Sequence, residues 1–171
     1  MALVLNEEQV MLKDSAAGFL AEKATVAHLR ELRDSHSERG FSDAVWREMV
    51  NMGWAGIAIP EAFGGLGYGY TGLGLVLEQA GRNLSASPLQ STVLVAATLV
   101  AELGSGGQKE QWLPAIASGQ KLVTLALQEG RHHAPEQTAA HAVQEGDEYL
   151  INGVNTLVLA AHVAGSFLVI A

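Results

Sequence analysis

Residues 59–69 read Ile59-Pro60-Glu61-Ala62-Phe63-Gly64-Gly65-Leu66-Gly67-Tyr68-Gly69, and this stretch decides how the chain is interpreted. It places a proline and an acidic residue before four glycines in six positions. Glycine adopts backbone conformations that other residues rarely hold, and proline favours turns. A helical pattern follows over residues 71–82. The sequence therefore predicts a structured glycine loop that leads into a helix.

The composition of the chain excludes several classes of protein. Its 171 residues are 49% hydrophobic and 16% charged, which supplies a core and rules out a disordered chain. The net charge is −8 and the basic residues are scattered, so we expect no nucleic-acid binding. Cysteine is absent, which excludes disulfides, thiolate catalysis and cysteine–metal sites. We expect a cytoplasmic chain, because there is no signal-peptide pattern and polar residues interrupt the long uncharged runs that could span a membrane.

Helical patterns fill the first two thirds of the chain. Asn6 with Gln9 forms a helix-capping signal, and Ser42 caps a later helix with an inner stripe that includes Trp46 and Met49. The predicted helices span about 7–23, 26–33, 42–53, 71–82, 89–103 and 108–118. On the first of them, we expect the buried face to carry Val10, Met11, Ala17, Gly18 and Ala21.

After Gly119 the pattern changes to short β-rich segments, at 122–127, 139–144, 149–151 and 167–171. Gly146-Asp147 is a turn signal between two of them. Helices followed by strands predict an α+β fold, with an N-terminal all-α helical bundle at 1–119 and an incomplete antiparallel β-barrel or sheet domain at 120–171. So few strands cannot close a sheet that is buried on both faces. We therefore expect the chain to be part of a longer protein or to pair with another chain.

Two other patterns carry little functional information. Residues 67–72 match G-x-G-x-x-G, but in a dinucleotide-binding fold that motif follows a strand directly, whereas a long loop precedes it here. His132, His133 and His141 lack the spacing and the partner carboxylates of a metal site, so we interpret this region as a polar loop and expect no metal.

The glycine loop and three further motifs resemble the acyl-CoA dehydrogenase family. Residues 60–67 resemble that family's P-E-x-x-G-G-x-G loop, and 78–82 resemble its helix end E-E-x-G-R. Residues 104–119 resemble G-x-x-x-Q-K-x-x-Y-L-P-x-L-A-x-G, and 146–153 resemble G-D-x-Y-x-L-N-G. The order and the spacing of these motifs, more than any single one, carry the resemblance.

The resemblance implies an oxidoreductase that uses FAD to desaturate an acyl-CoA thioester between its α and β carbons. It implies a helical domain, a middle β domain and a C-terminal four-helix domain, of which this chain would cover the first and part of the second. In most of the family the catalytic glutamate lies in the C-terminal domain, so we name no catalytic residue in this chain. Implied partners are the acyl-CoA substrate, a second acyl-CoA dehydrogenase-like chain in a homo- or hetero-oligomer, and an electron-transfer flavoprotein as the acceptor.

The resemblance also assigns cofactor positions, and there the chain departs from the family. Leu125, Leu127 and Gln128 stand at the end of the first strand, where the family's T-E-P-x-x-G-S-D begins. Leu157 replaces a tryptophan and Leu159 a threonine that lie beside the flavin in the family. A lost hydrogen bond to a buried flavin atom costs about 1–3 kcal/mol. We therefore expect FAD to bind weakly or not at all to this chain alone.

The same alignment suggests Ser91, Thr92 and Val95 as residues that line an acyl pocket. Plain core packing is the alternative for these three positions. Two hypotheses on function stay open. In the first, the chain is an acyl-CoA dehydrogenase subunit whose FAD site is completed by a partner chain. In the second, it is a non-catalytic structural subunit or pseudoenzyme of a heteromeric acyl-CoA dehydrogenase.

Overall fold

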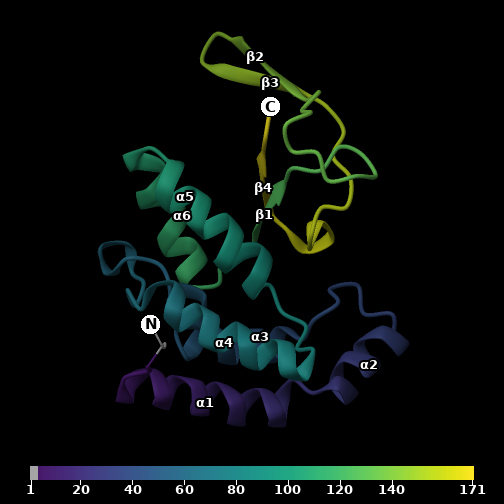
Figure 1. The fold of residues 1–171 in the computed structure, drawn as a ribbon. Coiled ribbons are helices and arrows are strands. Elements are labelled where there is room, and N and C mark those ends of the chain that lie inside the picture. The colour runs from purple at the N-terminus through teal and green to yellow at the C-terminus, as the bar shows by residue number, and fades with distance from the viewer. Residues whose placement is uncertain (1–3) are drawn as a thin grey trace.

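The computed structural model describes residues 4–171, in which a group of helices is followed by strands (Figure 1). Residues 1–3, the start of the predicted helical domain, lie outside the described residues. The predicted α+β class, with helices first and an incomplete sheet region second, is confirmed. The elements are α1 (Glu7–Lys23), α2 (Val26–Asp34), α3 (Asp43–Asn51), η1 (Trp54–Gly56), η2 (Glu61–Phe63), α4 (Gly69–Asn83), η3 (Leu89–Ala96), α5 (Ala97–Leu103), α6 (Gly106–Ala117), β1 (Val123–Ala126), β2 (His141–Glu145), β3 (Glu148–Asn152), η4 (Ala161–Val163) and β4 (Ser166–Val169).

The predicted helix caps are present. The side chain of Asn6 accepts a hydrogen bond from the backbone N–H of Gln9 at 2.8 Å, and Gln9 accepts one from the N–H of Asn6 at 3.1 Å. Ser42 caps α3 by accepting from the N–H of Val45 at 3.3 Å. Each cap satisfies backbone donors that the first turn of a helix leaves free, so both helices begin where the sequence predicts.

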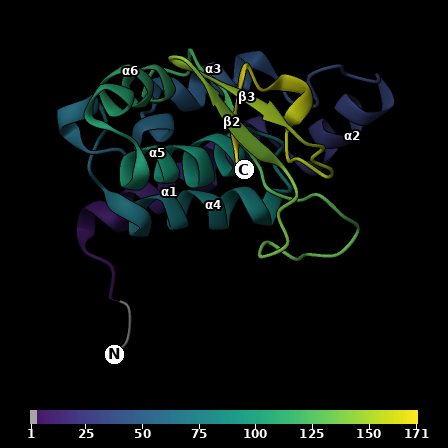
Figure 2. The same cartoon turned by 90° about the horizontal axis from the view of Figure 1, so that it is seen from above.

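Helix α1 packs along α4, and Figures 1 and 2 both show the two helices side by side. Its buried residues are Ala16 and Leu20, and Phe19 meets Trp54 edge to face with ring centroids 5.4 Å apart. The predicted buried face of α1 is therefore wrong. Met11 is 71% exposed and Val10 is 41% exposed. Apolar residues lie all round this helix, so the 3.6-residue period alone does not select the stripe that meets α4.

The glycine loop folds back onto the segment that precedes it. The N–H of Gly67 donates to the carbonyl of Ile59 at 3.0 Å, and the N–H of Gly65 donates to the carbonyl of Pro60 at 3.2 Å. A Cβ atom at Gly65 would collide with the backbone carbonyl of Ile59. Gly64 has a φ of +78°, in the left-handed region. This close self-contact fixes the start of α4.

A second core joins the helical part to the strands. Leu113 and Ile116 of α6 are fully buried with Val100 of α5 and Val123 of β1. The predicted helix over 89–103 is divided into two elements, because η3 is a π-helix and α5 is an α-helix. An apolar pattern on all sides of a helix does not distinguish these two hydrogen-bonding periods, and π-helical segments often occur at functional sites.

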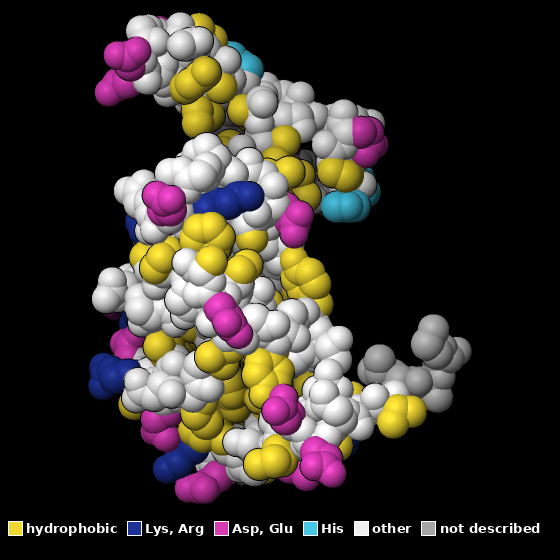
Figure 3. Space-filling model, turned by 90° about the vertical axis from the view of Figure 1, so that its left-hand side faces the viewer, with side chains coloured by type: hydrophobic (Ala, Val, Ile, Leu, Met, Phe, Trp, Pro, Cys, Tyr) yellow, Lys and Arg dark blue, Asp and Glu magenta, His cyan; other side chains and the backbone are white. Residues whose placement is uncertain are grey.

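The strands form two separate pairs. β2 and β3 pair antiparallel through the predicted Gly146-Asp147 turn. β1 and β4 pair parallel, with Val123 opposite Ser166, which differs from the expected antiparallel sheet. All ten residues of β2 and β3 are exposed, and apolar side chains gather on this hairpin where it protrudes at the top of Figure 3. The long connection between β1 and β4 brings them together edge to edge in the same direction, which the strand pattern alone does not reveal.

Candidate functional site

A cavity of about 210 Å³ lies between η3, β1 and the segment 157–159. It gathers seven of the eight residues that the sequence singled out as cofactor or substrate positions. Thr124 and Val158 also line it, and neither is among the predicted residues. The lining residues are Ser91, Val95, Thr124, Leu125, Leu127, Gln128, Leu157, Val158 and Leu159. Segments that are far apart in the sequence thus form one site.

Thr92 is the predicted residue that does not line the cavity. It is 1% exposed, and its hydroxyl donates to the carbonyl of Val123 at 2.9 Å and accepts from the N–H of Val123 at 3.2 Å. The two bonds fasten η3 to the first residue of β1. Thr92 therefore positions the two walls of the cavity.

The third wall is the segment 156–160, which β1 and its extension hold in place. The hydroxyl of Thr124 donates to the carbonyl of Leu159 at 2.6 Å. The N–H of Thr156 donates to the carbonyl of Gln128, also at 2.6 Å. Leu157 and Ala160 have φ values of +53° and +56°, which are uncommon for residues with a side chain. An isolated hydroxyl in an otherwise apolar strand is the sequence signal that could have identified Thr124.

The polar side chains of the cavity already have backbone partners. Ser91 donates to the carbonyl of Pro88 at 3.3 Å, and the Thr124 hydroxyl is used by Leu159. The Gln128 amide donates to the carbonyls of Gly130 and His132, at 3.1 and 2.6 Å. The side chains of Leu125, Leu127, Leu157 and Leu159 carry no donor at all. Among the lining side chains, none has a free donor for a flavin ring, so these residues do not fit a complete FAD site.

The segment 157–159 is open to solvent on its outer side. Leu157 is 81% exposed and Leu159 is 52% exposed. The two leucines present apolar surface at the positions where the family resemblance predicts an aromatic ring and a hydroxyl. Exposed apolar surface of this kind is stabilised when another surface covers it.

Glu129 is the one acidic residue that the chain shares with the family's motif in this region. Its two carboxylate oxygens accept from the N–H groups of Ala139 and Ala140, at 2.7 and 2.8 Å. These bonds close the loop between β1 and β2. Glu129 therefore stabilises the conformation of this loop.

Other chemistry is sparse over residues 4–171. The structure there holds no group of three or more His, Asp or Glu side chains able to bind a metal ion. No helix in the same range is long and apolar enough to cross a membrane. Glu78 in the last turns of α4 pairs with Arg82 at 2.8 Å, and this hydrogen bond lowers the pKa of the Glu78 carboxyl.

Comparisons with known proteins agree with this fold. Residues 6–120 match the profile of the acyl-CoA dehydrogenase N-terminal domain. The chain is 33% identical over 145 residues to acyl-CoA dehydrogenase FadE27 of Mycobacterium tuberculosis. The aligned region covers 85% of this chain and 37% of FadE27.

Solved structures give the same result. A variant of the Tcur3481–Tcur3483 steroid ACAD superposes with a TM-score of 0.86 at 34% identity, over 95% of this chain and 44% of that chain. The ChsE4–ChsE5 complex from Mycobacterium tuberculosis superposes with a TM-score of 0.85 at 28% identity, over 98% of this chain and 44% of that chain. The chain thus spans less than half the length of these relatives. It belongs to the acyl-CoA dehydrogenase family.

Proposed function

We propose that this chain is a subunit of an acyl-CoA dehydrogenase that desaturates an acyl-CoA thioester with FAD, and that another chain supplies most of the flavin contacts. One observation carries the proposal. The positions that the family resemblance assigns to the acyl tail, on η3, face the positions that it assigns to the flavin, on β1 and 157–159, across a single cavity.

The acyl side of the cavity suits a hydrocarbon tail. Ser91 and Val95 present small side chains from η3, and Leu125 and Leu127 face them from β1 and its extension. The hydroxyl of Ser91 is turned to a backbone carbonyl, which leaves an apolar surface toward the cavity. Apolar walls stabilise a bound hydrocarbon by removing it from water.

The flavin side of the cavity is the incomplete part. Its polar side chains are engaged with the backbone, and Leu157 and Leu159 offer no donor. When bound, FAD would supply the hydride chemistry, while this chain would contribute an apolar wall beside it. Two similar structures, the Tcur3481–Tcur3483 ACAD and the ChsE4–ChsE5 complex, each contain two different proteins. This supports a heteromeric assembly, with an electron-transfer flavoprotein as the expected electron acceptor.

A second candidate is a structural subunit that binds no flavin and keeps the fold for assembly alone. The same engaged donors favour it, since the side-chain donors of Thr124 and Gln128 are bonded to backbone carbonyls and leave none for FAD. In this case the leucines at 157 and 159 serve only to contact the partner.

Purification separates the two candidates. The full-length protein is produced alone and together with an acyl-CoA dehydrogenase-like partner, and the flavin absorbance of each preparation is measured before and after addition of acyl-CoA. The first candidate predicts a yellow complex that is bleached by acyl-CoA and loses activity when Leu159 of this chain is replaced by a charged residue. A complex whose flavin content and bleaching are unchanged by that substitution supports the structural subunit. A complex that contains no flavin contradicts the proposal that this chain is a subunit of an FAD-dependent dehydrogenase.

A further inference from the structure

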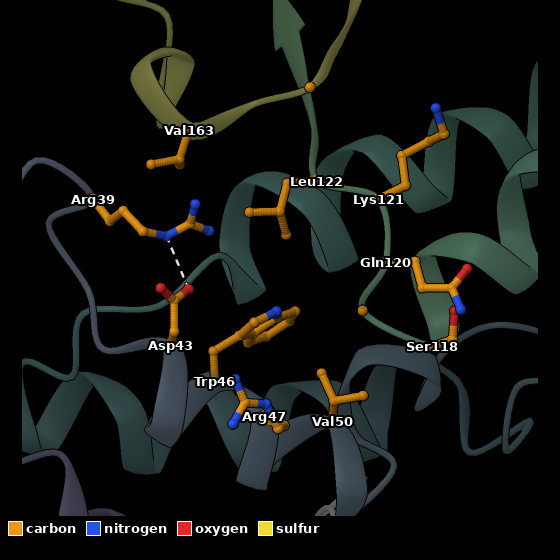
Figure 4. Close-up of a pocket in the computed structure, with 12 residues that line it drawn as sticks. Arg39, Asp43, Trp46, Arg47, Val50, Ser118, Gln120, Lys121, Leu122 and Val163 are labelled. Carbon is orange, nitrogen blue, oxygen red and sulfur yellow. Dashed lines mark ion pairs between the residues drawn. The ribbon is translucent and has the colours of Figure 1, made fainter.

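A second cavity, of about 550 Å³, lies between α3, the segment 118–122 and the residues around η4. Helix α3 forms its floor, residues 118–122 form one wall, and η4 lies above it (Figure 4). It shares no lining residue with the cavity between η3 and β1. Its size falls in the range of small-molecule sites, which is about 300–1,000 Å³.

The charge of this cavity is opposite to that of the chain. Its lining contains Arg39, Arg47 and Lys121 against a single acidic residue, Asp43. These are three of the ten basic residues in a chain with a net charge of −8. A local excess of positive charge in an acidic protein attracts anions to that place selectively.

Arg39 is held in position through its Nε, and within residues 4–171 its two terminal nitrogens have no ion-pair partner. Its Nε pairs with Asp43 at 2.9 Å, and its guanidinium lies over the ring of Phe41, 4.9 Å from the ring centre. Figure 4 shows the guanidinium pointing from its loop into the space between Trp46, Leu122 and Val163. A guanidinium that is already ordered loses little entropy when its terminal N–H groups bind an oxyanion.

The roof and the floor of the cavity are fixed as well. Nε2 of His162 in η4 lies 3.1 Å from the carbonyl of Arg39, which ties the roof to the arginine loop. Trp46 is 7% exposed and lines the cavity, and over residues 4–171 its indole N–H is not among the buried nitrogens that lack a partner, so it stays accessible to solvent. Lys121 turns away toward the ring of Trp112, at 4.7 Å, and so contributes charge rather than a direct contact.

We propose that this cavity binds a phosphate-bearing small molecule through Arg39 and the indole N–H of Trp46. Two positive charges in excess match the dianionic form of a phosphate monoester, and Val50, Leu122 and Val163 offer an apolar surface to the organic part of the ligand. The proposal does not depend on FAD or on acyl-CoA chemistry, because it concerns a different cavity.

The test follows the indole N–H resonances of the full chain by NMR during titration with inorganic phosphate, adenosine 5′-monophosphate and adenosine. Replacement of Trp46 by Phe identifies its resonance, and fully buried Trp54 serves as the internal reference. A saturable shift of the Trp46 resonance with phosphate or the nucleotide, and none with adenosine, is the expected result. A shift with inorganic phosphate but not with the nucleotide would indicate a site for the free anion. Tighter binding of the nucleotide than of phosphate would indicate a site for an organic phosphate ester. A shift that sodium chloride reproduces at equal ionic strength overturns the proposal.

Two variants of opposite sign make the test independent of folding. Arg39→Gln should weaken binding by about fivefold or more, since it removes the contacting group. Asp43→Asn should tighten binding by about threefold to fivefold, because it removes the one competing negative charge while the amide oxygen can still accept from Nε of Arg39. Asp34→Asn is the matched control, since Asp34 is similarly exposed, also pairs with an arginine, and does not line the cavity. Unchanged or weaker binding in Asp43→Asn contradicts the proposal.

Discussion

The hydroxyl of Thr92 makes two hydrogen bonds with the backbone of Val123, one as a donor at 2.9 Å and one as an acceptor at 3.2 Å. Val123 is fully buried, so water cannot replace either bond. This pair connects the π-helix η3 to β1 at the point where the helical part meets the strands. It therefore sets the distance across the cavity between Ser91 and Leu125.

Replacing Thr92 by valine tests this connection. The side chain keeps its shape, but the buried N–H and carbonyl of Val123 both lose a partner, so the free energy of unfolding should fall by about 2–3 kcal/mol. Urea denaturation measures this change. Thr98→Val is the control, because the Thr98 hydroxyl donates to the carbonyl of Leu94, four residues earlier in the chain, and it should cost about 0.5 kcal/mol or less. If the two substitutions lowered the free energy of unfolding equally, the bonds to Val123 would contribute no more to stability than the Thr98 bond does.

The glycine loop gives a second pair of matched substitutions. Gly65→Ala should lower the free energy of unfolding by about 3 kcal/mol or more, because the new Cβ collides with the backbone carbonyl of Ile59. Gly64→Ala meets no atom within 4 Å and suffers only from its φ of +78°, at about 1–2 kcal/mol. The midpoints of urea denaturation decide the order. A larger loss at Gly64 than at Gly65 would contradict the close approach of the loop to Ile59.

Local features of the fold could be predicted from the sequence, and long-range ones could not. The caps at Asn6 and Ser42 depend on residues three positions apart, and both are present. The buried stripe of α1 depends on its contact with α4, and the predicted stripe with Met11 is wrong. The parallel pairing of β1 with β4 likewise joins segments at the two ends of the β region. The hydrophobic period of a segment identifies it as a helix or a strand, but it does not identify the element that packs against it.

The candidate site shows the same division. The family resemblance selected Ser91, Val95 and the leucines of β1 and 157–159, and the fold brings them to one cavity. It did not show that Thr92 faces the backbone of Val123, or that Thr124 holds the carbonyl of Leu159. Both are hydroxyl groups with partners that are distant in sequence. Their tasks follow from three-dimensional contacts that no spacing rule encodes.

The width of the acyl side of the cavity predicts a change in specificity. In an active assembly, Ser91→Leu should fill space beside Val95 and lower kcat/KM for longer acyl chains by about tenfold or more, while shorter chains are affected less. Steady-state kinetics with a series of acyl-CoA lengths measures this. Ser91→Ala removes the hydroxyl without filling the cavity, so it should leave the length preference unchanged. An unaltered preference in Ser91→Leu would mean that η3 does not line the acyl site.

The ion pair at the end of α4 predicts a pH effect. The hydrogen bond from Arg82 is the main cause of the lowered pKa of Glu78. Desolvation opposes it as the second-largest effect, and the charges of Arg82 and Lys13 lower the pKa further. A lowered native pKa means that the contribution to stability is present above the ordinary value of 4.5 and is lost as the pH falls through the native value. Arg82→Gln should raise the pKa of Glu78 toward 4.5, as measured by carbon-13 NMR of the carboxyl group.

Lys13→Gln is the control for this titration and should move the Glu78 pKa less, because Lys13 acts only through its charge. A native pKa of Glu78 that is unchanged in Arg82→Gln would rule out the hydrogen bond as the cause.

Our central proposal is that this chain has the fold of the N-terminal part of an acyl-CoA dehydrogenase and does not hold FAD by itself. A direct titration of the purified chain with FAD, followed by flavin fluorescence, tests it. We predict no saturable binding at micromolar FAD for the chain alone. At higher FAD concentrations, Leu159→Thr should bind about tenfold more tightly than the unmodified chain, because it adds one hydroxyl. Stoichiometric binding of FAD to the unmodified chain at micromolar concentration would contradict the account.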